Sequence, residues 1–345
     1  MVETTRTAVV ANQTPNSQDD FFHAVGSDPS WSESYYFYYF DAAQNIGGIT
    51  RVGFRAHDGW KDYMHIVFLE GRRIVFCYDR KDMPPGDEDM RVGALSLERT
   101  DPFKRWKIAF DGKGQDLPDG RVLITPKRDR PEGWLQMTDV AMEIDFTALC
   151  DPLYMFSAGG QHGHFEQPGR CTGHITVNGQ RRTFSGLGLR DKSWGPRPWT
   201  APGKGGGDRK PVELASGAAS GLFTMWITSV LNENTAFALT FSKTPDGGVA
   251  GGGFLYKDGA YHQMLSGSVD SDFEEGSLVH RRNRISATFE NGHSIKGVGE
   301  ILSLGPSKIP MPGGATLVNS GMTRFTLDTG ETGLGSSEYW FSVKR

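Results

Sequence analysis

Asp191 stands near the end of the stretch GLGLRDKSWGPRPW, residues 186–199, and shares one face of a predicted strand with Leu187 and Leu189. Alternate side chains of a strand point to the same side, so the carboxylate follows the two leucines onto an apolar wall. Desolvation disfavours the charged form of a carboxyl group, and this would make Asp191 a general acid. The alternative is structural: Asp191 ends the strand and accepts backbone N–H bonds from the turn.

The stretch HGHFEQ places His162, His164 and Glu166 on one face of another predicted strand. Two histidines and a carboxylate are the donor set of a facial metal triad. The rest of a recognisable metal motif is missing, so we expect no metal here. We expect His164 and Glu166 to act as base, relay or orienting groups and His162 to contact the substrate; a polar rim is the simpler alternative.

Trp194 and Gly195 follow Asp191 and predict a tight corner. A large ring can pack as a rigid plug, and glycine allows a turn that is closed to other residues. The corner would then hold the side chain of Asp191 in place. Arg190 and Arg197 flank it and can bind a carboxylate or an enolate-like oxygen of the substrate.

Two aromatic stretches supply further candidates for binding. SYYFYYFD, residues 34–41, carries rings on both faces, so we expect a strand that is covered on both sides, with Tyr38 reaching a cavity. GSSEYWFSV near the C-terminus places Glu338 and Trp340 on one face. We expect Tyr38, Trp194, Glu338 and Trp340 to line or support a binding cavity.

These residues need a scaffold, and the pattern of turns indicates an all-β one. Asp-Gly and Asn-Gly pairs recur throughout and favour the positive φ angles of tight hairpin turns. Stretches such as GRRIVFCYDR and GHITVNGQRRTFSGLGL lie between them, and helical periodicity over twelve or more residues is hard to find. The sequence therefore predicts antiparallel hairpins arranged as sandwiches or barrels.

The chain also divides into segments of different character. Residues 1–30 are expected to form a tail with a short helix, which the stretch FFHAVGSDPSW could supply. Two β domains of similar strand density are expected over residues 31–155 and 156–345, with a junction near Asp151 and Pro152. Residues 200–212 are predicted to be a Gly- and Lys-rich loop, not a phosphate loop.

Composition excludes several classes of protein. The 345 residues carry a net charge of −4 without a Lys/Arg run, so no nucleic-acid partner is expected. Three dispersed cysteines suit a reducing compartment and give no zinc motif. The first twenty residues lack an apolar core and no apolar run has the length of a membrane span, so we expect a cytoplasmic protein. GxSxG, HExxH and a GxGxxG between strand and helix do not occur.

The segment RDKSWGPR, residues 190–197, contains the pattern Asp-x-x-Trp-Gly, and FEQPGR and an Asn-Gly hairpin precede it. With YFYYFDAAQNIGGITRVGFR, these residues resemble a bacterial branch of the carotenoid 1,2-hydratase and AttH-like superfamily of tandem lipocalin-like proteins. The resemblance covers nearly the whole chain. It implies two lipocalin-like barrels, a hydrophobic ligand site at or between them, and acid–base chemistry without an organic cofactor. Lys192 replaces a histidine that is frequent in the hydratases, which speaks against carotenoid hydration itself.

We therefore expect a cofactor-independent lyase, hydratase, isomerase or cyclase of secondary metabolism, acting on a terpenoid, steroid, polyketide or aromatic metabolite. Asp191, His164 and Glu166 would carry the proton transfers. The alternative is a non-catalytic carrier, because a barrel needs only shape and apolar walls to bind a hydrophobic ligand. A third interpretation is a metal-dependent enzyme that uses His162, His164 and Glu166. The small-molecule substrate is the expected partner, and a homodimer stays open.

Overall fold

The computed structural model describes residues 2–4, 14–155, 162–197, 221–243, 248–311 and 314–344. These residues form twenty strands and a few 3-10 turns, without an α-helix among them. The chain separates into two compact units, one comprising residues 12–197 and the other residues 1–11 and 198–345. The predicted all-β class with two barrel-like domains is confirmed. None of the helical segments in the described ranges has the length and apolarity to cross a membrane.

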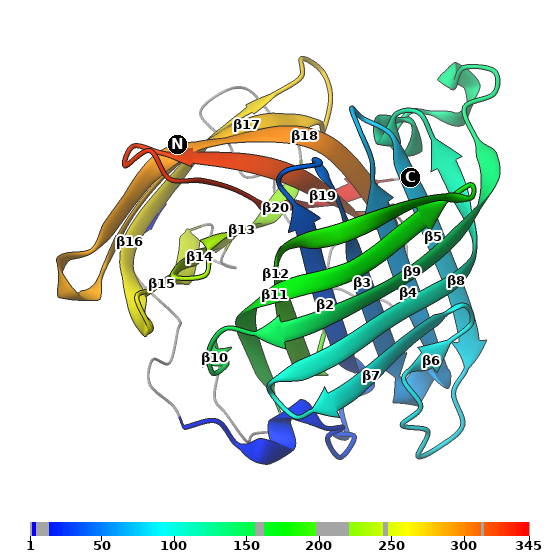
Figure 1. Cartoon of the computed structure of the whole chain (residues 1–345), viewed down its shortest axis with the longest axis horizontal. Helices are drawn as coiled ribbons and strands as arrows, with labels where there is room; N and C mark the ends of the chain where they lie inside the picture. Colours follow the sequence, from blue (N-terminus) through cyan, green and yellow to red (C-terminus); the bar gives the residue numbers. More distant parts are fainter. Residues whose placement is uncertain are drawn as a thin grey trace. The chain divides into compact units, whose positions relative to one another are not determined.

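The first unit contains eleven strands: β2 (Trp31–Asp41), β3 (Ile46–Arg55), β4 (Trp60–Phe68), β5 (Ile74–Asp82), β6 (Arg91–Val92), β7 (Leu95–Asp101), β8 (Arg105–Leu117), β9 (Gln136–Ala148), β10 (Leu153–Tyr154), β11 (Gly163–Val177) and β12 (Gln180–Pro196). Antiparallel pairing runs β11–β12–β2–β3–β4–β5–β8, and β9 pairs with both β8 and β11. These pairings close a ring of eight strands, a barrel seen in blue, cyan and green in Figure 1. Closure removes the exposed sheet edges that an open sheet would leave.

Residues on alternate positions of β2 face opposite sides of this barrel. Tyr35, Phe37 and Tyr39 belong to the hydrophobic core inside it, together with the inward residues of the other strands. Tyr36 and Tyr38 lie on the outer face and are buried as well, at 6% and 0% exposure. The expectation that both faces of this strand are covered is correct.

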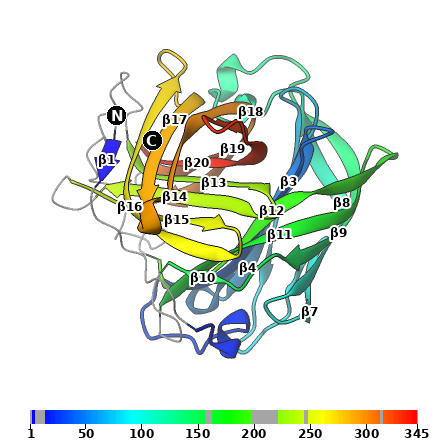
Figure 2. The same cartoon turned by 60° about the vertical axis from the view of Figure 1, so that its left-hand side comes forward.

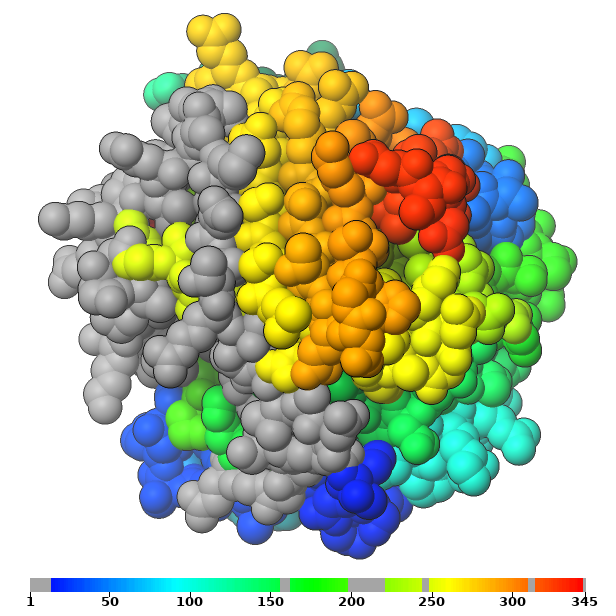
Figure 3. All heavy atoms as spheres, turned by 90° about the vertical axis from the view of Figure 1, so that its left-hand side faces the viewer, coloured from blue at the N-terminus to red at the C-terminus, as the bar shows by residue number. Residues whose placement is uncertain are grey.

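The second unit contains β1 (Val2–Thr4), β13 (Leu222–Asn232), β14 (Thr235–Lys243), β15 (Val249–Lys257), β16 (Ala260–Phe273), β17 (His280–Phe289), β18 (Ser294–Met311), β19 (Gly314–Leu327) and β20 (Thr332–Lys344). The order is β1–β16–β15–β14–β13–β20–β19–β18–β17, and β16 also pairs with β17, so β13 to β20 close a second ring of eight (Figure 2). Its outer surface over β15 to β18 is yellow to orange in Figure 3. There Arg284 of β17 pairs with Asp272 of β16 at 2.7 Å between Nη2 and Oδ2.

Three of the predicted Asn-Gly and Asp-Gly pairs form the expected turns. Asn178–Gly179, Asp258–Gly259 and Asn291–Gly292 have positive φ at both residues. The pair Asp111–Gly112 was wrongly predicted as a turn, because it lies inside β8. Asp119 accepts a hydrogen bond from the N–H of Arg121 and caps a 3-10 turn at Gly120–Leu123, so the predicted hairpin at Asp119–Gly120 is also wrong.

The predicted domain boundary after residue 155 is wrong. Strand β12 pairs with β2 over ten residues and β11 pairs with β9, so residues 163–196 complete the first barrel. A strand density that is similar on both sides of a junction does not reveal which strands share hydrogen bonds. The predicted helix within residues 21–31 is also wrong, since the only helical turn in this region is the 3-10 segment η1, Ser17–Asp20. The predicted loop at 200–212 lies outside the described residues.

Candidate functional site

The outer face of the first barrel carries a row of polar side chains across neighbouring strands. In this row Glu166 of β11 is the register partner of Asp191 of β12, which pairs with Tyr36 of β2, and Tyr36 pairs with Arg51 of β3. Register partners in antiparallel strands present their side chains on the same face. Glu166 and Asp191 are buried, at 0% and 8% exposure. The two predicted catalytic carboxylates therefore lie side by side.

A second row lies two residues further along the strands on the same face and adds a histidine and a hydroxyl group. His164 of β11 is the register partner of Ser193 of β12, and its Nδ1 lies 2.5 Å from the Ser193 Oγ. The other ring nitrogen, Nε2, lies 3.3 Å from Oε1 of Glu166. The Ser193 hydroxyl in turn lies 3.5 Å from Oδ1 of Asp191. These four side chains form a continuous chain of polar contacts with a carboxylate at each end, which we call the relay.

The hydroxyl of Ser193 has one proton, and this limits how the relay can be protonated. If the hydroxyl donates to Asp191, then Nδ1 of His164 must carry the proton that faces it. If the hydroxyl donates to Nδ1, then Nε2 carries the proton of a neutral ring and donates to Glu166. Moving one proton along the chain converts one arrangement into the other, so the relay can pass a proton between its two carboxylates.

Burial lowers the pKa of His164, Asp191 acts in the opposite direction, and Arg197 lowers it further. The net shift is downward, so the imidazole is neutral at neutral pH and can accept a proton. Burial also lowers the pKa of Arg197 to about 10, although Asp191 favours its charged form. A guanidinium therefore lies within electrostatic range of both His164 and Asp191.

On the other side of the first row the same outer face becomes apolar. Leu189 pairs with Tyr38, and Tyr38 pairs with Ile49 of β3, which pairs with Ile66 of β4. All four side chains are fully buried, and the ring of Tyr38 stacks on Phe40 with a centroid distance of 5.2 Å. The face thus has an apolar half and a polar half, and they meet at Asp191 and Tyr36.

Arg190 does not lie with Asp191, although it was predicted to bind the same substrate. It is on the opposite, inner side of β12 and is fully buried, with Nη1 2.7 Å from Oδ1 of Asp20. Its Nε donates to the side-chain oxygen of Gln167 at 2.7 Å. The alternation of a strand requires this separation, because adjacent residues face opposite sides. Arg190 is therefore part of the barrel interior.

Lys192 and Trp194 share the inner side with Arg190. Lys192 is paired with Glu33, at 2.6 Å between Nζ and Oε1, and is fully buried. The ring of Trp194 stacks on His23 with centroids 4.0 Å apart, and the ring leaves no room for a side chain at Gly163. Trp194 thus supports the strand from inside instead of lining the face that carries Asp191. Gly195 has a φ of 119°, which few residues other than glycine adopt, but Trp194 and Gly195 both lie inside β12, so the predicted corner is wrong.

Two other predicted residues belong to the second unit. Oε1 of Glu338 accepts a hydrogen bond from the Trp340 ring N–H at 2.7 Å, and Oε2 accepts one from the hydroxyl of Ser320 at 2.8 Å. Glu338 is buried at 5% exposure. The pair forms as its spacing predicted, on the outer face of the second barrel. Its role in binding stays a prediction.

The predicted His162 lies just before β11 and is exposed. Partial burial of its ring lowers the pKa of His162, and the charges of Arg197 and His164 lower it as well. His162 therefore interacts electrostatically with the relay. Within the described ranges, no group of three or more His, Cys, Asp or Glu side chains has an arrangement that could hold a metal ion. The three residues of HGHFEQ thus do not form a metal-ligand set in this structure.

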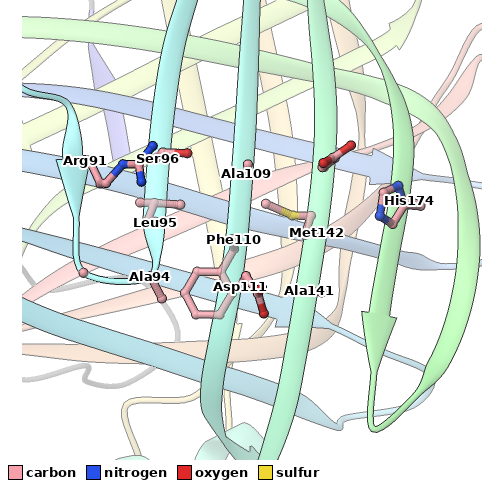
Figure 4. A pocket seen from close by; sticks show the side chains of 12 residues that line it. Arg91, Ala94, Leu95, Ser96, Ala109, Phe110, Asp111, Ala141, Met142 and His174 are labelled. Carbon is pink, nitrogen blue, oxygen red and sulfur yellow. The ribbon is translucent and has the colours of Figure 1, made fainter.

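A cavity of about 340 Å³ opens elsewhere on the first barrel, over β7, β8, β9 and β11 (Figure 4). Ala109, Glu143 and His174 are register neighbours on its floor, and the small side chains of Ala94 and Ala141 leave the depression. None of the predicted site residues lines it. In Figure 4 Arg91 and Ser96, which are register partners, lie together on one side of the cavity, and His174 lies on the other side.

One known protein family matches almost the whole chain. Residues 16–342 match a family described as a domain of unknown function, DUF7064. The chain belongs to this family. No curated protein matches the sequence.

Solved structures show what the fold is similar to. A protein of Nitrosomonas europaea assigned as AttH covers 97% of this chain and 99% of its own length, with 12% identity and a TM-score of 0.56. Kievitone hydratase from Nectria haematococca covers 99% and 96%, with 10% identity and a TM-score of 0.52. CghA covers 98% and 95%, with 10% identity and a TM-score of 0.54. The likeness confirms the resemblance to the AttH-like group at the level of fold.

Several residues of the site were not identified from the sequence. Ser193, which joins His164 to Asp191, could have been found, because it is two residues from Asp191 and so shares its face. Arg51, Arg55 and Asp62 come from β3 and β4, and only the pairing of distant strands places them near the relay.

Proposed function

We propose that the chain is a cofactor-independent enzyme of the lyase or isomerase type, which hydrates, isomerises or cyclises an apolar small molecule by acid–base chemistry. The observation that carries the proposal is the relay, in which a neutral imidazole and a hydroxyl connect two buried carboxylates. Enzymes in this structural group include a protein named as a hydratase, which favours the same class of reaction. The apolar half of the face favours an apolar substrate such as a terpenoid, steroid, polyketide or aromatic metabolite.

In the proposed mechanism Asp191 donates a proton to a carbon or oxygen atom of the substrate. The Ser193 hydroxyl accepts a proton from the attacking water in a hydration, or from another substrate carbon in an isomerisation, as it passes its own proton to Nδ1 of His164. The Ser193 hydroxyl returns this proton from His164 to Asp191, so the relay ends each turnover in its starting state. Arg197 stabilises negative charge that develops on a substrate oxygen. Glu166 orients the imidazole through Nε2.

The presence of a polar half beside the apolar half favours an enzyme over a non-catalytic ligand carrier. An apolar wall alone binds a ligand, and a carrier needs one or two hydrogen-bonding groups for orientation. Here four titratable or proton-bearing groups converge at the border of the apolar wall, with distances of 2.5 to 3.5 Å between neighbours. Burying polar and charged groups costs folding free energy, and binding an apolar ligand does not require this many of them.

The test is turnover in heavy water with a panel of terpenoid, steroid, polyketide and aromatic compounds, followed by mass spectrometry. Deuterium from solvent enters the product of a hydration, and of any isomerisation in which the relay exchanges its protons with solvent. Asp191→Asn is expected to lower turnover by roughly 10²-fold or more, the range for loss of a general acid or base, with an unchanged Tm. Ser193→Ala interrupts the chain and is expected to lower turnover less.

Asp139→Asn is the matched control, because Asp139 is an exposed carboxylate that pairs with Lys113 on the surface. This variant is expected to keep full activity. Binding of ligands without any turnover, with only a modest change of affinity in Asp191→Asn, would show a carrier instead. Full activity of Asp191→Asn on an identified substrate would remove the relay from the mechanism.

A further inference from the structure

Arg55, at the end of β3, is a buried cation without a full set of acceptors. Its side chain is 6% exposed, and its Nε makes no hydrogen bond within the part of the chain that the structure describes. The guanidinium stacks on the ring of Trp60, its register partner on β4, at 4.8 Å from the ring centroid. A buried charge that lacks an acceptor is costly, so such a group calls for a partner that is not part of the chain.

Arg51 is directed toward Arg55 by a glycine. A Cβ atom built on Gly53 would lie 2.3 Å from Nη2 and 2.6 Å from Nη1 of Arg51. The guanidinium of Arg51 therefore occupies the space above Gly53, midway along β3 between positions 51 and 55. In this position Nη1 donates to Oδ1 of Asp62 at 3.0 Å. Glycine at position 53 is what allows the two guanidinium groups to approach.

The guanidinium groups of Arg51, Arg55 and Arg197 repel one another in this cluster, although carboxylates lie among them. Burial and the nearby Arg51 lower the pKa of Arg55 to about 10, while Asp62 and Asp58 act in the opposite direction. Arg51 and Arg55 also lower the pKa of Arg197, which Asp191 and Glu33 raise. Asp62 is already bound to Arg51, and Glu33 is bound to Lys192 on the inner side. An added anion would relieve this repulsion.

We propose that Arg55 and Arg51 bind the acidic group of the ligand, so that the substrate of this site is a carboxylic acid with an apolar body. The inference rests on the proposed function for the role of the relay, but the binding site stands on its own residues. Arg51 and Asp191 are in one row with Tyr36 between them, which separates their backbones by about 9–10 Å. The acidic group is thus anchored away from the reacting atoms, and the apolar half of the face receives the body.

Binding measured by isothermal titration calorimetry tests this without any turnover. The probes are 4-phenylbutyrate and the neutral 4-phenyl-1-butanol, which differ only in the acidic group. The full chain is expected to bind the carboxylate at least 10-fold more tightly than the alcohol. Arg55→Met is expected to reduce this preference by about 10- to 100-fold, the range for loss of a charged hydrogen bond. Its Tm without ligand is expected to stay equal or to rise, because a buried unpaired cation is removed.

Gly53→Ala supplies a second variant that keeps every charge. The new methyl group occupies the place of the Arg51 guanidinium, so the preference for the carboxylate is expected to fall although Arg51 and Arg55 are both present. Arg73→Gln is the matched control, because Arg73 is already paired with Asp116 at 2.6 Å; it is expected to keep the preference.

Equal affinity for the acid and the alcohol, or no binding of the acid, overturns the inference. An unchanged preference in both Arg55→Met and Gly53→Ala overturns it too. These outcomes are independent of the proposed function, since loss of turnover in Asp191→Asn can occur with or without a preference for acids. Conversely, a strong preference that depends on Arg55 supports the inference even where Asp191→Asn keeps its activity.

Discussion

The buried pair of Asp20 and Arg190 makes the first barrel depend on its N-terminal segment. Asp20 lies in the 3-10 turn before β2, and its Oδ1 is 2.7 Å from Nη1 of Arg190, with both side chains fully buried. Oδ2 also accepts the backbone N–H of Phe103 at 2.7 Å and faces Nε of Arg99 at 3.5 Å. Asp20→Ala therefore leaves two guanidinium groups in the barrel interior without their shared carboxylate.

Removing one partner of a buried ion pair costs about 3–5 kcal/mol, because the other charge stays buried and uncompensated. For a unit of this size a change of 1 kcal/mol shifts Tm by about 2–4 °C, so Asp20→Ala is expected to lower Tm by about 6–20 °C. The free energy of unfolding, measured by urea titration with circular dichroism, gives the comparison. Arg282→Ala is the control: Arg282 pairs with Glu300 at a similar 3.1 Å, but both are exposed, and loss of such a pair costs at most about 1 kcal/mol.

The double variant Asp20→Leu/Arg190→Met separates charge burial from packing. Apolar side chains of similar volume can replace a buried ion pair at little cost, so this variant is expected to be more stable than Asp20→Ala. A double variant that loses as much stability as Asp20→Ala would mean that the hydrogen bonds to Phe103 and Gln167, not the paired charges, stabilise the segment. An Asp20→Ala variant with wild-type stability would refute the reasoning altogether.

Two further predictions concern the same inner side of the barrel. Trp194→Ala removes a fully buried ring that stacks on His23 and is expected to cost about 3–5 kcal/mol of stability, measured by urea titration; a loss below about 1 kcal/mol would show that the end of β12 does not depend on this ring. Burial alone lowers the pKa of His23, but hydrogen bonds to Asp19 and Glu33 outweigh it and raise the pKa above 6.5. The folded state thus favours protonated His23, so its contribution to stability is fully present below pH 6.5 and is lost as pH rises through the raised pKa. The difference in Tm between wild type and His23→Gln should shrink over that range, and a difference that grows with pH would contradict this assignment.

Much of the relay could be predicted from the sequence because one hairpin determines its register. A two-residue turn at Asn178–Gly179 pairs Val177 with Gln180, and counting outward from there pairs Glu166 with Asp191. The turn was identified from its residue types alone. Local chemistry therefore brings the predicted acid, base and carboxylate together without any knowledge of the remaining strands.

The arginine cluster could not be predicted in the same way. Arg51 reaches the relay only through the pairing of β12 with β2, two strands that are far apart in the sequence. No turn connects them, so their register follows from barrel closure and core packing. The contact between Arg51 and Asp62 depends in addition on the missing side chain of Gly53, which a sequence pattern does not single out.

The sequence also could not show which face of β12 is the inner one. Leu187, Leu189 and Asp191 share a face, as predicted, but β2 carries aromatic rings on both of its faces, so alternation alone does not tell which face lines the barrel. The inner face turned out to carry Arg190 and Lys192, which are compensated by Asp20 and Glu33.

This arrangement explains why the register of β12 is strongly specified despite its mixed polarity. A slip of one residue would move every side chain of the strand to the other face. Lys192 would leave Glu33 and His23, and Asp191 would enter the barrel interior next to Asp20, so that two carboxylates would face each other in a buried space. The buried charges on the inner face thus hold the relay in place on the outer face, although no atom of the inner network takes part in the proposed chemistry.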